Sequence, residues 1–212
     1  MLDSNMAGKA MTVRGPIDPE KLGITLMHEH LLFEGMGTKR YAPDYATPAT
    51  EAAQWYEELT LENLHIARSR WNSPKDNSIL ADEKMAVDEV LQFKNWGGST
   101  IVEPTNNGIR RDPMGLFRVS NATGLNVVMG SSWYVKGSYP EDIDERTAED
   151  LAAEIVRDIT VGIGSMGIRS GIIGEVGVNG DPLTPNEIKV IRASAQASRT
   201  TGAPISFHWG GN

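Results

Sequence analysis

Two histidines separated by a single residue, His28 and His30, are the side chains of this sequence best suited to chemistry. They follow a short apolar run at residues 24–27, which predicts a β-strand. Because successive side chains of a strand point to opposite faces, His28 and His30 are expected to point the same way. Two imidazoles on one face at a strand end can chelate a divalent metal ion. A metal site is therefore the first hypothesis, although exposed or core-bound histidines would also fit the pattern.

The composition limits both the ligands and the partners that such a site can have. The 212 residues, of which 40% are hydrophobic, suffice for one domain with its own core, spanning residues 1–212. The sequence has no cysteine, so any metal must be held by imidazole and carboxylate, which suits zinc, manganese, cobalt or iron. A net charge of −8 without a dominant basic cluster argues against nucleic acid as a partner. No segment reads as a signal peptide or membrane span, so a soluble cytoplasmic protein is expected.

Predicted strands and helices alternate along the chain. Apolar runs predict strands at residues 24–27, 100–102, 126–129, 171–174 and 204–207. Periodicity and helix-start signatures predict helices at residues 79–96, 112–124, from 147 onward and from 184 to about 202. A long insertion, residues 31–78, follows the first strand and is expected to turn helical around residues 50–69. Four crossovers between five short strands indicate a parallel sheet with helices outside it.

The candidate chemical residues favour a barrel over an open sheet. Those at the carboxyl ends of predicted strands are His28, His30, Glu103, Glu175 and His208. In a closed barrel these ends converge on one mouth, whereas an open sheet would spread them along an edge. The glycine-rich fingerprint of a nucleotide-binding open sheet is also missing after the first strand. We therefore expect a TIM-type (β/α)8 barrel, of which this chain holds roughly the first five βα units.

Several short motifs resemble the phosphotriesterase family of the amidohydrolase superfamily, in particular its phosphotriesterase-related branch. They are TVRGPI (12–17), GITLMHEHLL (23–32), RDP (111–113), TGLNVVMG (123–130), GEVG (174–177) and GAPISFH (202–208). The motifs run in family order across nearly the whole chain. The resemblance implies a (β/α)8 barrel with two divalent metal ions, zinc first among them. These ions would activate water for attack on an ester, lactone, amide or phosphotriester of a small-molecule substrate.

The resemblance also implies roles for individual residues. His28 and His30 would bind the more buried metal ion, and His208 would bind the more exposed one. The family's bridging ligand is often a carboxylated lysine at the end of the fourth strand, and Glu175 occupies that position here. A glutamate already has two oxygens and can bridge two ions without carboxylation. Because it is shorter than a carboxylated lysine, it would change the metal spacing or the backbone approach.

The family pattern continues beyond this chain, which ends at Asn212, directly after the fifth predicted strand. A complete barrel of this kind needs about 250 residues. The family's second histidine at the exposed metal and its proton-shuttling aspartate would lie in the last three βα units. We therefore expect a fragment of a longer enzyme, with an inactive chain that binds at most one metal ion as the alternative. The open sheet edges would need cover from another chain, and the resemblance allows a homodimer.

Other residues near the expected mouth of the barrel have two possible roles each. Trp133 and Tyr134 follow the third strand and could line an apolar pocket for a leaving group, or only pack their loop on the barrel. Glu103 could orient a ligating histidine, or only accept a bond from a backbone amide. Asn106, Asn107, Arg110 and Arg111 follow in the next loop, where they could contact a polar substrate, but a capped loop that faces solvent is the favoured interpretation.

A different enzyme class could use two of the same carboxylates. Glu103 and Glu175 at strand ends could be the acid and the nucleophile of a retaining glycosidase, whose carboxylates lie about 5 Å apart. That interpretation leaves the three histidines at the strand ends unexplained.

Overall fold

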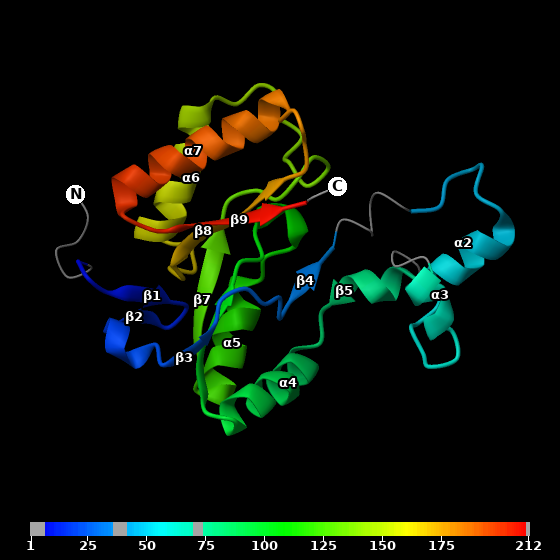
Figure 1. Cartoon of the computed structure of the whole chain (residues 1–212), viewed down its shortest axis with the longest axis horizontal. Helices are drawn as coiled ribbons and strands as arrows, with labels where there is room; N and C mark the ends of the chain where they lie inside the picture. Colours follow the sequence, from blue (N-terminus) through cyan, green and yellow to red (C-terminus); the bar gives the residue numbers. More distant parts are fainter. Residues whose placement is uncertain (1–6, 36–41, 70–73, 211–212) are drawn as a thin grey trace.

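The computed structural model of this chain describes residues 7–35, 42–69 and 74–210, and a five-stranded parallel sheet lies at its centre (Figure 1). In spatial order the strands are β3 (Ile24–Leu26), β6 (Gly98–Glu103), β7 (Asn126–Ser131), β8 (Ile172–Val178) and β9 (Ile205–Trp209). Each strand therefore pairs with the strand of the next βα unit. The order of the strands never reverses, as it does at the switch point of an open doubly wound sheet. The predicted five-stranded parallel sheet is confirmed, and its order is that of half a TIM-type barrel.

Four long helices cover the outer face of the sheet. They are α4 (Glu83–Asn95), α5 (Pro113–Thr123), α6 (Ala148–Thr160) and α7 (Pro185–Thr201). Each begins at an N-cap side chain that accepts a backbone N–H, namely Asp82, Asp112, Thr147 and Thr184. Such caps satisfy amide groups that the first helical turn leaves without a partner. The sequence signatures thus identified the caps of α5, α6 and α7, whereas the Asp82 cap of α4 was not predicted. No helix in the described ranges is long and apolar enough to cross a membrane.

The hydrophobic core lies between the sheet and these helices in two parts. Ile101 and Val127 of the sheet pack with Leu116 of α5, while Ile173 of β8 packs with Ile155 of α6. The opposite, concave face of the sheet has a smaller apolar cluster of Val102, Val128 and Ile172. These three side chains border a cavity of about 820 Å³. Strand side chains alternate between the two faces, so the helices cover one apolar face and the cavity borders the other.

An N-terminal hairpin, which the strand patterns did not predict, lies beside the sheet. It pairs β1 (Ala10–Thr12) with β2 (Gly15–Ile17) in antiparallel fashion. The amide of Val13 donates to the carbonyl of Val127 at 2.9 Å, and the side chain of Val13 is buried. Strands of three residues are too short to show a clear alternation of polar and apolar side chains.

The insertion after β3 leaves the sheet and returns through a narrow neck. β4 (Phe33–Glu34) and β5 (Ile79–Leu80) pair antiparallel there, and α2 (Ala49–Trp55), α3 (Leu64–Ser69) and the 3-10 turn Lys75–Ser78 lie beyond them. Figure 1 shows α2 and α3 well apart from the sheet. The expected helical region around residues 50–69 is present as two short helices. The helix predicted from residue 79 was wrong at its start: it begins at Glu83, because residues 79–80 pair with β4. Residues 36–41 and 70–73 of the insertion lie outside the described residues.

A buried carboxylate at the start of α7 gives a test of the fold that is independent of any metal. Glu187 accepts backbone N–H groups from Asn179 at 2.7 Å, Gly180 at 3.1 Å and Thr184 at 2.7 Å. Burial raises the pKa of Glu187, but these bonds outweigh it and the net shift is downward. A lowered carboxyl pKa stabilises the fold above the ordinary value, and this contribution is lost as the pH falls through the folded-state pKa.

We expect Glu187→Ala to lower the free energy of unfolding at neutral pH by about 2–3 kcal/mol, because buried amides lose a charged acceptor. Urea denaturation followed by circular dichroism measures this loss, which should shrink in acid. Glu149→Ala, in the first turn of α6 and exposed, is the matched control. An equal loss in both variants would contradict the role of the buried bonds.

Candidate metal centre

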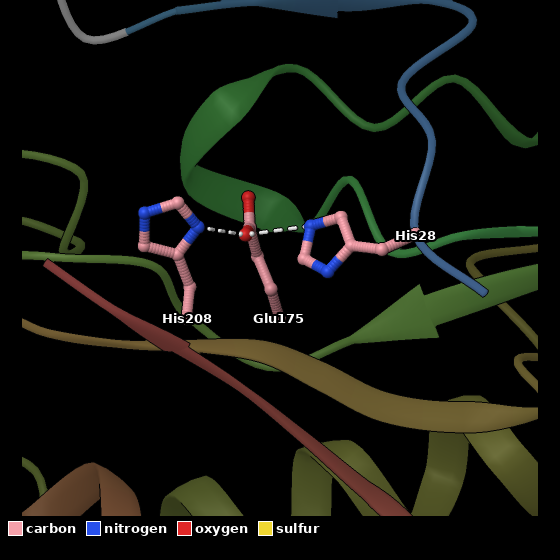
Figure 2. A group of neighbouring side chains, drawn as sticks. All are labelled: His28, Glu175 and His208. Carbon is pink, nitrogen blue, oxygen red and sulfur yellow. Dashed lines mark ion pairs between the residues drawn. The ribbon is translucent and has the colours of Figure 1, made fainter.

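Three histidines converge on one buried carboxylate at the carboxyl ends of the strands. Oε2 of Glu175 lies 3.0 Å from Nε2 of His28 and 2.8 Å from Nδ1 of His208. Oε1 of the same carboxylate lies 3.3 Å from Nε2 of His30. The possible ligand atoms of His28, Glu175 and His208 all lie within 4.8 Å of one another. Figure 2 shows the imidazoles of His28 and His208 on opposite sides of the Glu175 carboxylate. All four residues that were predicted as metal ligands therefore meet in one place.

The strands position these residues differently from the prediction in two details. Glu175 lies in the middle of β8 rather than at its end, and β3 ends at Leu26, before the histidine pair. The amide of Glu29 still donates to the carbonyl of Val102 at 3.0 Å, which keeps the segment beside β6. Gly174 has a φ of +144°, and a Cβ there would lie 2.6 Å from the carbonyl oxygen of Ser206. Glycine before Glu175 thus lets β9 approach β8 closely.

Electrostatics in the metal-free site couple the carboxylate to the imidazoles. Burial raises the pKa of Glu175, whose side chain is 2% exposed, but His30, His208 and His28 together outweigh it and lower that pKa. Burial lowers the pKa of His30, but its hydrogen bond to Glu175 and the surrounding carboxylates outweigh it and raise that pKa. The site thus places a negatively charged carboxylate beside several imidazole nitrogens. A proton or a metal cation can balance that negative charge.

The donor set fits a divalent metal. Oε2 of Glu175 is buried and has no hydrogen-bond partner among the described residues, although two imidazole nitrogens flank it. A buried carboxylate oxygen without a hydrogen bond is costly unless a cation compensates it. Imidazole nitrogen and carboxylate oxygen are common ligands of zinc and of other first-row metals. His28 and His208 share one oxygen of Glu175 and His30 faces the other, whereas the resemblance groups His28 with His30. How the ligands divide between two ions stays a prediction.

Glu103 lies beneath the site and is fully buried. Its Oε1 accepts the amide of Leu31 at 3.2 Å and the hydroxyl of Thr105 at 2.5 Å. The Thr105 oxygen in turn lies 2.7 Å from Nδ1 of His30. Burial raises the pKa of Glu103 to about 7, against the lowering effect of these contacts. Glu103 therefore both accepts a backbone amide and supports a candidate ligand through Thr105, a residue that the sequence analysis did not identify.

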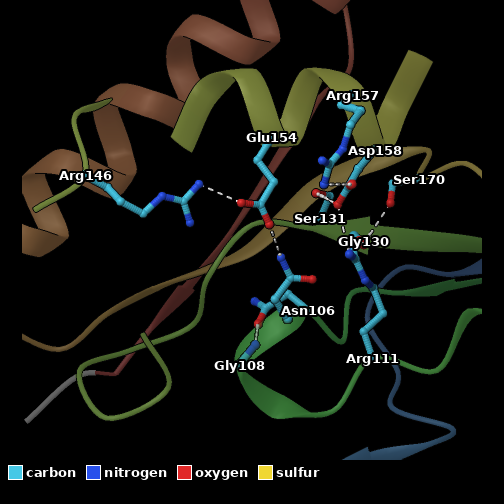
Figure 3. A network of polar contacts seen from close by, with 11 residues as sticks. Asn106, Gly108, Arg111, Gly130, Ser131, Arg146, Glu154, Arg157, Asp158 and Ser170 are labelled. Carbon is cyan, nitrogen blue, oxygen red and sulfur yellow. Dashed lines mark hydrogen bonds and ion pairs between the residues drawn. The ribbon is translucent and has the colours of Figure 1, made fainter. Parts of the chain in front are cut away.

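The loop after β6 holds the backbone of Glu175. Asn106, which is fully buried, donates from its side-chain amide to the carbonyl of Glu175 at 2.6 Å. The amide of Glu175 donates to the carbonyl of Pro104 at 2.8 Å. The prediction of a loop that faces solvent is confirmed for Asn107 and Arg110, which are exposed, but it was wrong for Asn106 and Arg111, because the loop folds these two side chains inward. The Arg111 side chain is 5% exposed and pairs with Asp158 of α6 in the polar network of Figure 3.

The two aromatic residues predicted near the mouth lie in different surroundings. The hydroxyl of Tyr134 lies 3.0 Å from Nε2 of His208, and burial, followed by the charge of Glu175, raises the pKa of Tyr134 to about 12. Trp133 is 2% exposed and packs in the core beside α6 and α7, with the Arg146 guanidinium 5.4 Å from its ring. This burial favours loop packing over a pocket wall for Trp133. A pocket role for Tyr134 stays a prediction.

Comparison with known proteins identifies the family. The profile of the phosphotriesterase family matches residues 8–212. The chain belongs to the phosphotriesterase family. A phosphotriesterase-related protein of Nematostella vectensis is 38% identical over 209 residues, which are 96% of this chain and 58% of that protein. An N-acetyltaurine hydrolase of Xenopus tropicalis is 37% identical over 212 residues, which are 99% of this chain and 58% of the hydrolase.

A solved structure extends the comparison. The crystal structure of a resiniferatoxin-binding protein from Rhodobacter sphaeroides superposes with a TM-score of 0.87 at 38% sequence identity. The match covers 97% of this chain and 56% of that one. The present chain thus spans somewhat more than half the length of the relatives that it matches, and the five-stranded sheet is a half-barrel of the TIM type.

Proposed function

We propose that this chain forms the metal-binding half of a metal-dependent hydrolase. The convergence of His28, His30 and His208 on the buried Glu175 carries the proposal. These four residues would hold two divalent ions, with zinc as the first expectation and manganese, cobalt or iron as other candidates. Such ions supply Lewis acidity and lower the pKa of bound water, which makes a nucleophile available near neutral pH.

The chain's own side chains would hold a proton beside the reacting group. If Nδ1 of His208, which faces Glu175, bound a metal ion, the ring proton would lie on Nε2, and Nε2 would donate to the oxygen of Tyr134, 3.0 Å away. The Tyr134 O–H would then be free to donate to a substrate oxygen that gains negative charge. Because the pKa of Tyr134 is raised to about 12, this hydroxyl keeps its proton at neutral pH. The tyrosine thus orients the histidine and offers a hydrogen bond to substrate.

An N-acyl amide with an anionic end is the substrate class that we place first. The proposal follows the name of the relatives, N-acetyltaurine hydrolase, at 37% identity for the protein of Xenopus tropicalis. Hydrolysis of such an amide breaks the C–N bond, with water adding OH to the acyl carbon and a proton to the nitrogen. Lactones, other esters and phosphotriesters are the alternatives, because the same polarisation acts on any carbonyl or phosphoryl oxygen.

The glycosidase interpretation loses its support in the structure. Glu103 is fully buried, and one of its oxygens accepts both the Leu31 amide and the Thr105 hydroxyl. A general acid must reach the glycosidic oxygen, and a carboxylate enclosed in this way cannot do so. The three histidines around Glu175 also have no part in that mechanism.

Metal content and hydrolysis, measured together on the purified chain, test the proposal. We expect elemental analysis to find close to two equivalents of zinc, manganese or iron, and one equivalent or less would overturn the binuclear site. Acetate release from N-acetyltaurine, followed by proton NMR beside a lactone and a phosphotriester, should stop in a chelator and return with zinc. Two equivalents of metal without hydrolysis of any substrate would show that these residues hold the ions but do not suffice for hydrolysis, which would contradict the proposed activity of the chain.

A further inference from the structure

We propose that Thr105 is a positioning residue that fixes the tautomer of His30 and so makes Nε2 the atom that binds metal. The inference rests on the metal site proposed above. Thr105 follows β6, two residues after Glu103, and both side chains are fully buried. Neither faces Glu175 directly, so their effect on the site passes through His30.

The direction of the hydrogen bonds follows from the number of donors that each group has. Oε1 of Glu103 accepts the Leu31 amide, which can only donate, so this oxygen acts as an acceptor whether or not Oε2 carries a proton. The Thr105 hydroxyl lies 2.5 Å from the same oxygen and has a single proton to donate. Having given that proton to Glu103, the Thr105 oxygen must accept from its other neighbour, Nδ1 of His30, at 2.7 Å.

The consequence for His30 is a proton held on Nδ1. Nε2, which faces Glu175 at 3.3 Å and donates to it in the metal-free chain, is then the nitrogen that would give up its proton and offer a lone pair to a metal ion. Metal-binding histidines are commonly held by such a bond from the second ring nitrogen, which orients the ring and raises its basicity. Here the bond is made by a hydroxyl that a buried carboxylate orients in turn. Without Thr105 the ring could rotate or exchange tautomers, and the ligand atom would no longer be fixed.

The experiment compares Thr105→Val, Thr105→Ser and a matched control. Thr100→Val changes another fully buried threonine of β6, whose hydroxyl donates to the carbonyl of Leu22 at 2.6 Å, away from His30. We expect Thr105→Val to weaken zinc binding by about 10–100-fold in competition with a chelator. Thr105→Ser, which keeps the hydroxyl, should bind zinc nearly as the parent chain does, and Thr100→Val should leave zinc affinity unchanged.

A second readout uses the metal-free chain and therefore does not depend on the proposed function. NMR of nitrogen-15-labelled histidine reports whether Nδ1 of His30 carries a proton that a hydrogen bond protects from exchange with water. We expect a slowly exchanging Nδ1 proton in the parent chain and in Thr105→Ser, and a rapidly exchanging one in Thr105→Val. Unchanged exchange of this proton together with unchanged zinc affinity in Thr105→Val, or an equal loss of affinity in Thr100→Val, would overturn the proposal. A parent chain that binds no zinc but shows the protected Nδ1 proton would contradict the proposed function while supporting the role of Thr105.

Discussion

Glu175→Gln is expected to abolish tight metal binding while the chain stays folded. Glutamine has nearly the same shape, but it carries no charge and turns one of the two oxygens into an NH2 donor. Oε2 of Glu175 lies between His28 and His208, and Oε1 faces His30, so either orientation of the amide opposes a candidate ligand with a donor. Because loss of outer-shell partners alone costs about 10–100-fold in affinity, loss of this ligand should cost more than about 100-fold.

Zinc competition with a chelator and elemental analysis both measure this loss. Glu187→Gln is the matched control, because Glu187 is also a buried glutamate with several contacts and lies at the start of α7, outside the site. It should lose stability and keep its metal. His28→Ala should also lower the metal content. If Glu175→Gln retained two equivalents of metal, the bridging role of this carboxylate would be wrong.

Glu175→Gln should also change the pKa of His30 in the metal-free site. The pKa of Glu175 is lowered, so its charge stabilises the fold above the ordinary value of 4.5, and this stabilisation is lost as the pH falls through the folded-state pKa. The pKa of His30 is raised, so its contribution is complete below 6.5 and is lost as the pH rises through the folded-state pKa. The pair thus stabilises the metal-free chain most between these two values. In Glu175→Gln, NMR titration should find a lower pKa for His30, because burial then acts with less opposition.

The sheet and its helices could be predicted from the sequence because their signals are local. Apolar runs such as residues 126–129 fit a buried parallel strand, and the Asp112-Pro113 and Thr184-Pro185 pairs identify helix starts within a few residues. The neck of the insertion has no such signal. Its strands β4 and β5 have two residues each, so their pairing depends on tertiary structure rather than on periodicity.

The metal centre could be predicted only in part, because most of its contacts join residues that are far apart in the sequence. His28 and His30 stand together in the sequence, whereas their meeting with Glu175 and His208 was expected from strand ends and from the family resemblance. Thr105 and Asn106 were missed as supporting residues because their partners lie 75 and 69 residues away. A polar loop residue usually faces solvent, and only the three-dimensional path of the loop shows that Asn106 is buried.

Arg111→Met should cause a large loss of stability. Nη2 of Arg111 lies 2.9 Å from Oδ2 of Asp158, with side chains 5% and 2% exposed (Figure 3). Its Nη1 donates to the carbonyl of Gly130 at 3.0 Å, and Ser131 donates to Asp158 at 2.9 Å. Removing Arg111 breaks a buried pair, which costs about 3–5 kcal/mol, and leaves Asp158 with the weaker contact at 3.8 Å to Arg157, whose side chain is 60% exposed. Urea denaturation measures the change, and Arg118→Met, which breaks an exposed pair with Glu83, should have a much smaller effect.

The double variant Arg111→Met/Asp158→Leu separates stability from positioning. A buried ion pair can often be replaced by apolar residues without a net loss of stability, so we expect the double variant to recover most of the single variant's loss. The loop between Pro104 and Arg111 would then lack the ion pair that attaches it to α6, and this loop carries Asn106 against Glu175. Zinc affinity should therefore remain below that of the parent chain even where stability returns. Full recovery of both would show that the pair contributes only to the fold and that Asn106 is held by its own contacts.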